Sequence, residues 1–165
     1  MTASVLNAAP ARSRDRPVDD LSPRVLVVSE DPCFIERARA IVGTEGGRLI
    51  ACLGPTASPC ILDEKLVCPL AARTAVALVD APAGGVFRHH WREIPAGDYA
   101  VRLQRAHPQT FVILSVLAVG QAGPTGEVAV GEGRDEALQQ LVWLLRALAI
   151  ARSRKGLLTR RGGAS

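Results

Sequence analysis

Short apolar runs that end at turn residues alternate with amphipathic stretches along this chain. The central run covers residues 75–80 and ends at Asp80. The turn residues Pro82 and Gly84 follow it. Runs of this kind are typical of strands that are covered on both faces, as in the centre of a parallel sheet. Ligands of such sheets bind at the carboxyl ends of the strands, so Asp80 marks the expected site of any chemistry.

The same pattern predicts four more strands and three helices. The predicted strands are 24–28, 48–53, 75–80, 111–117 and 128–130. The predicted helices are 32–43, 95–106 and 135–148. The first helix has the clearest start, because Asp31 suits the N-cap and Pro32 suits the first helical position. The second ends at His107, because a residue before proline is disfavoured in a helix.

Three segments interrupt this alternation. Residues 56–73 contain prolines and charges and predict an irregular crossover, with at most a weak helix at 62–67. Residues 81–94 predict a loop. Residues 118–126 are rich in glycine and too short for a helical crossover. The strand at 128–130 is therefore reached either by a bare crossover, which makes it parallel, or by a hairpin, which makes it antiparallel. We prefer the parallel strand, because a helix then opens in the expected place.

Length and composition indicate one α/β domain with an aliphatic core. The chain has 165 residues, of which 48% are hydrophobic and 4% aromatic, and a chain of this length can bury a core without disulfides. We expect a flexible leader at 1–23, the folded domain at 24–151 and a basic flexible tail at 152–165.

The net charge of +4 is mild and is concentrated near the end of the sequence. Its basic residues there are Arg152, Arg154, Lys155, Arg160 and Arg161. A solvated terminus is the expected state of this tail, and contact with an acidic partner, a membrane surface or nucleic acid is the alternative. We expect no membrane span, because no segment runs about 18 residues without a charge or turn. With no recognisable signal segment, a cytoplasmic protein with reduced cysteines is expected.

Residues 102–115 read Arg-Leu-Gln-Arg-Ala-His-Pro-Gln-Thr-Phe-Val-Ile-Leu-Ser. This segment resembles the third helix and fourth strand of the receiver domain of bacterial response regulators, and the order of predicted elements across residues 24–148 is similar to that family. The resemblance implies a flavodoxin-like, doubly wound α/β fold. Its sheet is mostly parallel and five-stranded, with strand order 2-1-3-4-5.

The resemblance also implies a site. Asp80 matches the phosphoacceptor of the family, and Ser115 matches the hydroxyl that contacts the phosphoryl group. Glu30 and Asp31 match the acidic pair that holds Mg²⁺ together with the phosphoacceptor. The set is physically sensible, because converging carboxylates repel one another and a hard dication relieves that repulsion.

Two features depart from the family pattern. The family has a lysine at the end of its fifth strand, where this sequence has Gly131-Glu132-Gly133. An acid there would add repulsion to the site. The fourth helix of the family is missing, since residues 118–126 cannot form it. Both departures favour a degenerate receiver whose phosphorylation switch has been lost or altered.

Other candidate chemistry has ordinary explanations. Cys52, Cys60 and Cys68 recur at equal intervals, and with Cys33 they could bind zinc or an iron-sulfur cluster, or Cys60 and Cys68 could form a redox pair. Their spacing matches no tight metal knuckle, however. The pair His89-His90 is expected in an exposed loop, because adjacent side chains seldom point at one ion.

The first interpretation is a stand-alone, receiver-like regulatory domain that acts through protein contacts. A kinase or a regulatory target is the expected partner, a homodimer is allowed, and neither specific nucleic-acid binding nor a membrane is expected. The alternative is a metal- or redox-responsive module that uses Cys52, Cys60 and Cys68. An enzyme is not expected, because no motif supplies a recognisable base and nucleophile.

Overall fold

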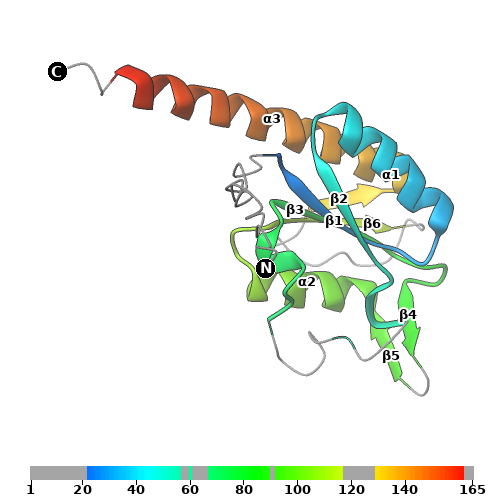
Figure 1. Cartoon of the computed structure of the whole chain (residues 1–165). Helices are drawn as coiled ribbons and strands as arrows, with labels where there is room; N and C mark the ends of the chain where they lie inside the picture. The colour runs from blue at the N-terminus through cyan, green and yellow to red at the C-terminus, as the bar shows by residue number, and fades with distance from the viewer. Residues whose placement is uncertain (1–21, 57–59, 61–66, 90–91, 117–128, 162–165) are drawn as a thin grey trace, which may run out of the picture.

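The computed structural model describes residues 22–56, 60, 67–89, 92–116 and 129–161 (Figure 1). Within these ranges, none of the helices combines the length and the apolar character that a membrane span requires. A five-stranded sheet forms the centre. Its strands are β1 (Arg24–Val28), β2 (Arg48–Cys52), β3 (Val76–Asp80), β6 (Phe111–Val116) and β7 (Ala129–Glu132).

The strands run in the order β2-β1-β3-β6-β7, and every neighbouring pair is parallel. This is the predicted flavodoxin-like α/β fold with its 2-1-3-4-5 order, which is thereby confirmed. The fifth strand is parallel, as preferred. In the register of β3 and β6, Asp80 of β3 lies opposite Ser115 of β6.

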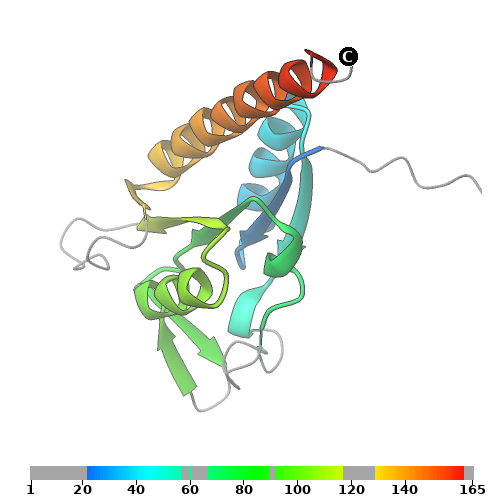
Figure 2. The same ribbon diagram turned by 90° about the vertical axis from the view of Figure 1, so that its left-hand side faces the viewer.

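Three helices in the described ranges cover the sheet, two on one face and one on the other (Figures 1 and 2). They are α1 (Pro32–Thr44), α2 (Ala96–Ala106) and α3 (Arg134–Arg161). On the α1 and α3 side, Val27 and Leu78 pack with Leu141. On the α2 side, Val28 and Val79 pack with Leu103. Strand residues therefore alternate between two mainly aliphatic cores, as the pleat of a doubly covered sheet requires.

The crossover between β2 and β3 is irregular, as predicted. It contains the 3₁₀ turns η1 (Gly54–Thr56) and η3 (Ala71–Arg73). Most of the weak helix predicted at 62–67 lies outside the described residues, and so does the segment 118–126 from which the fourth helix is predicted to be missing.

Residues 81–94 contain a hairpin, so the prediction of a loop there is wrong. β4 (Val86–His89) and β5 (Arg92–Pro95) pair antiparallel and form a separate two-stranded sheet. Its inward residues Phe87 and Ile94 are buried, and Phe87 packs edge-to-face on Tyr99 of α2. The hairpin has four residues per strand and one buried side chain each, which is too short a pattern to recognise in the sequence.

The last helix is longer than predicted. α3 begins at Arg134 and continues to Arg161, whereas the sequence predicts a helix over 135–148 and a flexible tail from 152. The buried stripe ends where predicted, because the side chains after Leu148 are exposed as far as Arg154. The helical backbone nevertheless continues for about three more turns, since alanine, leucine and arginine are strong helix formers.

Candidate functional site

Asp80 ends the central strand and is held inside the protein. All five residues of β3 are buried, and Asp80 is 2% exposed. Its Oδ2 atom accepts a hydrogen bond of 2.7 Å from the Ser29 hydroxyl, which follows β1. The sheet register thus brings the ends of β1 and β3 together at the carboxyl edge, as expected for ligand sites of such sheets.

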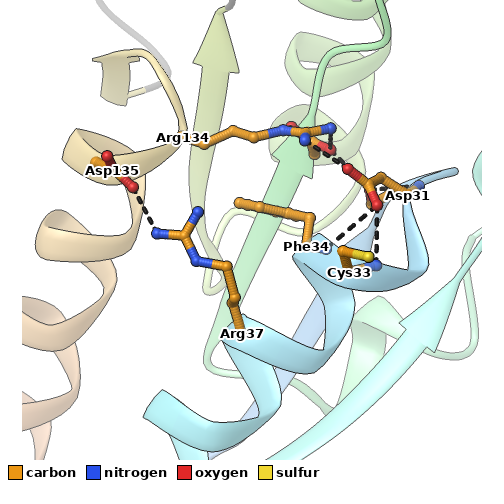
Figure 3. A network of polar contacts seen from close by, with 8 residues as sticks. Asp31, Cys33, Phe34, Arg37, Arg134 and Asp135 are labelled. Carbon is orange, nitrogen blue, oxygen red and sulfur yellow. Dashed lines mark hydrogen bonds and ion pairs between the residues drawn. The ribbon is translucent and has the colours of Figure 1, made fainter.

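A single arginine occupies the space beside Asp80. The guanidinium of Arg134, the first residue of α3, donates from Nε to Asp80 Oδ1 at 2.9 Å and from Nη2 to Oδ2 at 2.8 Å. Its Nη1 atom donates to Asp31 Oδ2 at 2.5 Å. The guanidinium also lies 5.0 Å from the ring centroid of Phe34, a cation-π contact (Figure 3). We call Arg134, Asp80 and Asp31 the arginine clamp.

The hydrogen bonds of the arginine clamp join a charged donor, Arg134, to charged acceptors, Asp80 and Asp31. Hydrogen bonding to Arg134 is the main cause that lowers the pKa of Asp31 below its usual 3.8. Hydrogen bonding to Asp80 is the main cause that raises the pKa of Arg134. A bidentate fork of this kind fixes the geometry of the carboxylate as well as its charge.

Asp31 has two roles at once. Its Oδ1 atom caps α1 by accepting from the backbone amides of Cys33 at 2.8 Å and Phe34 at 3.4 Å, and its Oδ2 atom binds Arg134. The backbone amide of Asp31 donates to the Ser29 hydroxyl at 3.0 Å. Ser29 therefore connects the α1 turn to Asp80.

Glu30 does not join this cluster. Its side chain is exposed and accepts a hydrogen bond of 2.7 Å from the Thr56 hydroxyl. The structure brings together Asp31 and Asp80 through Arg134 and leaves Glu30 outside.

Ser115 lies beside Asp80 in the register but does not hydrogen-bond to it. Its hydroxyl is fully buried and has no hydrogen-bond partner among the described residues. Its backbone carbonyl accepts from the amide of Ala81 at 3.0 Å.

The residues present do not fit a bound Mg²⁺. A dication at this edge would need the oxygens of Asp31 and Asp80, and the Arg134 guanidinium lies between those two carboxylates and binds both. In the described part of the chain, no group of three histidine, cysteine or acidic side chains is placed to hold a metal ion. The cation at this site is a side chain of the protein itself.

Sequence reasoning missed Arg134 and Ser29. The cation of the family is expected at the end of the fifth strand, where this chain has Gly131-Glu132-Gly133, and Arg134 is the next residue. The signal was present, because an arginine at the first turn of a helix opposes the helix dipole and calls for a nearby acid. Glu132, the acid that was expected to add repulsion, is exposed, and its backbone amide bonds to Glu136.

Cys52, Cys60 and Cys68 lie around the core on the α2 side of the sheet, and Cys33 lies apart from them on α1. All four are free; Cys33 is exposed and Cys68 is buried. The Cys60 sulfur lies 3.7 Å from the Tyr99 hydroxyl, and burial raises the pKa of the Cys52 thiol. The second of the adjacent histidines lies outside the described residues.

The sequence matches no family model and no curated protein. The chain has the fold of a response regulator receiver domain. A receiver domain protein of Bacillus halodurans matches at a TM-score of 0.50 and 10% identity, covering 77% of this chain and 97% of that one. A protein described as pilus assembly-related, from Burkholderia pseudomallei, matches at 0.51 and 18% identity, covering 78% and 90%.

These identities show a common fold and leave the chemistry to be argued from the residues. In this receiver-like fold, Asp80 stands at the end of the central strand, where the phosphoacceptor of the family is expected. The arginine clamp is the feature of this chain that bears most directly on that expectation.

Proposed function

We propose that this chain is a receiver-like regulatory domain that works through protein contacts, with the arginine clamp in place of a phosphorylation switch. The observation that carries the proposal is the bidentate contact of Arg134 with Asp80. One side chain supplies the positive charge that a metal ion and a lysine supply in the family that the sequence resembles.

The clamp argues against a nucleophilic Asp80. A carboxylate that attacks a phosphodonor needs an oxygen that is free and open to solvent. Here Oδ1 accepts from Arg134, Oδ2 accepts from Arg134 and Ser29, and the residue is 2% exposed. The clamp also ties α3 to the start of α1 through Asp31. The domain therefore presents to its partners an edge at which α1, β3 and α3 are joined.

A phosphodonor experiment tests this proposal. The chain is incubated with millimolar acetyl phosphate and Mg²⁺, beside a receiver domain that is competent for phosphorylation, and its intact mass is measured. We expect no adduct on the wild-type chain. A base-labile adduct on the wild-type chain that Asp80→Asn abolishes would make Asp80 a working phosphoacceptor and would overturn the proposal.

The alternative, a metal- or redox-responsive module built on Cys52, Cys60 and Cys68, has less support. A thiol acts as a nucleophile or ligand in its thiolate form, and burial raises the pKa of Cys52. Metal analysis of anaerobically purified protein separates the two functions, because stoichiometric zinc or iron is expected of the module alone.

The partner is expected to be a protein, either an upstream kinase or a downstream target. One structural neighbour is described as pilus assembly-related, so a component of such an assembly is one partner to examine.

A further inference from the structure

The last helix carries a surface that no element of the described chain covers. α3 has 28 residues, which corresponds to a length of about 42 Å. Its first half packs on the sheet through Leu138, Leu141 and Leu145. The helix then extends past the sheet (Figure 1), where residues 149–154 are all exposed.

Two large apolar side chains stand on the outer side of α3. Trp143 is 69% exposed and Ile150 is 57% exposed. They are seven residues apart, so they lie on the same side of the helix, with Ala147 between them and Arg154 next in the line. We call Trp143, Ala147, Ile150 and Arg154 the α3 outer face.

A groove borders this face on the α1 side. It has a volume of about 420 Å³. Its lining residues are Arg37, Ile41, Asp135, Leu138, Gln139 and Val142. Gln139, one of the lining residues, and Trp143 are four residues apart on α3, so the two side chains are neighbours on the helix surface. The apolar part of the groove can receive a large side chain of a partner, which is how the central contacts of many interfaces are made.

The charge of α3 indicates the chemistry of that partner. No acidic residue follows Glu136 in the sequence. The basic residues of α3 after that point are Arg146, Arg152, Arg154, Lys155, Arg160 and Arg161. Arg146 already binds Glu45 at the end of α1, at 2.8 Å. This ion pair within the chain shows that the basic side of α3 can bind an acidic side chain from a neighbouring helix.

We propose that the α3 outer face and the adjoining groove dock an acidic amphipathic helix of another protein. The apolar side chains of that helix would cover Trp143 and Ile150 and fill the groove, while its acids would face Arg154. This inference names the partner class of the proposed protein-contact function, and it rests on that function for its role in regulation.

Two other occupants fit less well. A second copy of α3 would bring its own basic residues against these, and like charges at close range oppose pairing. An amphipathic helix that lies in a bilayer keeps its cations on the face opposite its aromatic and aliphatic residues. Arg154 continues the line of Trp143 and Ile150, so this helix lacks that separation.

Binding of synthetic peptides tests the proposal. The probe is a fluorescently labelled peptide of three heptads, with leucine at the core positions and glutamate elsewhere; its partner probe carries lysine in place of glutamate. We expect the full chain to bind the glutamate peptide with a Kd on the order of 10 μM, weakening as salt screens the charges. We expect the lysine peptide to bind at least about tenfold more weakly.

Variants locate the site. Trp143→Ser and Ile150→Ser should each weaken binding of the glutamate peptide by about tenfold, and Arg154→Glu should weaken it further at low salt. The matched control is Leu53→Ser, because Leu53 is 49% exposed but follows β2, away from α3. Both Trp143 and Ile150 are exposed enough for their variants to fold, which circular dichroism verifies.

Three kinds of result would overturn the docking proposal. The first is peptide binding without the expected charge selectivity or location, that is, equal binding of the two peptides or binding that the α3 variants leave unchanged. The second is a dimer in sedimentation experiments that Trp143→Ser dissociates, which would assign the face to a second copy. The third is tighter binding to phosphatidylglycerol vesicles than to the peptide. None of these results depends on phosphorylation of Asp80, so the two proposals fail separately.

Discussion

The surroundings of Asp80 depend on two side chains from distant parts of the sequence. Ser29 precedes α1, and Arg134 opens the last helix. A buried carboxylate is costly unless it is paired and hydrogen-bonded, and here its oxygens accept three bonds from these two residues. At the scale of the residue, the site is therefore a matched set in which removal of Arg134 leaves the buried Asp80 without a cation.

Removal of the arginine should be costly. Arg134→Ala leaves Asp80 buried without its cation, and we expect a loss of about 3 kcal/mol in the free energy of unfolding. The measurement is urea denaturation at pH 7. The matched control is Arg37→Ala, because Arg37 and Asp135 form an ion pair whose side chains are 57% and 80% exposed. Such an exposed pair should change stability by less than about 1 kcal/mol. Equal losses in the two variants would contradict the role of the clamp.

His107 should make the protein less stable in mild acid. It is 1% exposed, its Nε2 atom accepts from the amide of Cys68 at 3.2 Å, and burial lowers its pKa below the usual 6.5. The unfolded chain therefore binds a proton at this residue before the folded chain does, so stability falls as the pH drops below about 6.5. Denaturation at pH 7 and pH 5 should show a smaller difference for His107→Gln than for the wild type. An unchanged difference would remove His107 as the cause.

The junction of β7 and α3 is the element that places Arg134. A Cβ atom on Gly131 would lie 2.6 Å from the backbone nitrogen of Ala137 and 2.8 Å from its Cα. Glycine therefore lets the first turn of the helix lie directly on the strand. This close approach holds the start of α3, and with it the guanidinium, at the carboxyl edge of the sheet.

Two glycine substitutions should act in opposite directions. Gly131→Ala meets backbone atoms that cannot move aside, so we expect a loss of about 1–3 kcal/mol. Gly43→Ala, within α1, meets no atom within 4 Å and should gain about 0.5–1 kcal/mol through helix propensity. Thermal unfolding of both variants measures the difference. A neutral Gly131→Ala would show that the junction can relax.

The elements that sequence analysis predicted are those with a strong apolar period. The buried strands, the Asp31 cap and the stripe of α3 were all recognisable, because each follows a rule that is local in the chain. The β4–β5 hairpin was missed, because its strands are short and, among the side chains that the structure describes there, Phe87 and Ile94 are the buried ones. The role of Arg134 was missed for a different reason: its place at the start of a helix indicates that an acid lies nearby, but only the three-dimensional fold determines that Asp80 and Asp31 are those acids.

At the scale of the whole molecule, the clamp predicts independence from magnesium. A Mg²⁺ site with a Kd of about 1 mM would add about 1.4 kcal/mol to the free energy of unfolding at about 10 mM Mg²⁺, and it would raise Tm by several degrees. We expect the Tm of the wild type to be the same in 10 mM MgCl₂ and in EDTA at matched ionic strength. Arg134→Ala frees the carboxylates of Asp31 and Asp80, so its Tm should rise with MgCl₂. A rise in the wild type would contradict the clamp.

The span of the clamp along the chain has a consequence for synthesis. Arg134 follows Asp80 by 54 residues and Asp31 by 103. A nascent chain on the ribosome therefore exposes both acids long before the arginine that neutralises them has been made. Until then β3 ends in an uncompensated charge, which opposes premature closure of the sheet. Completion of the native state should thus wait for the last helix, and fragments that stop before it should be readily degraded by proteases.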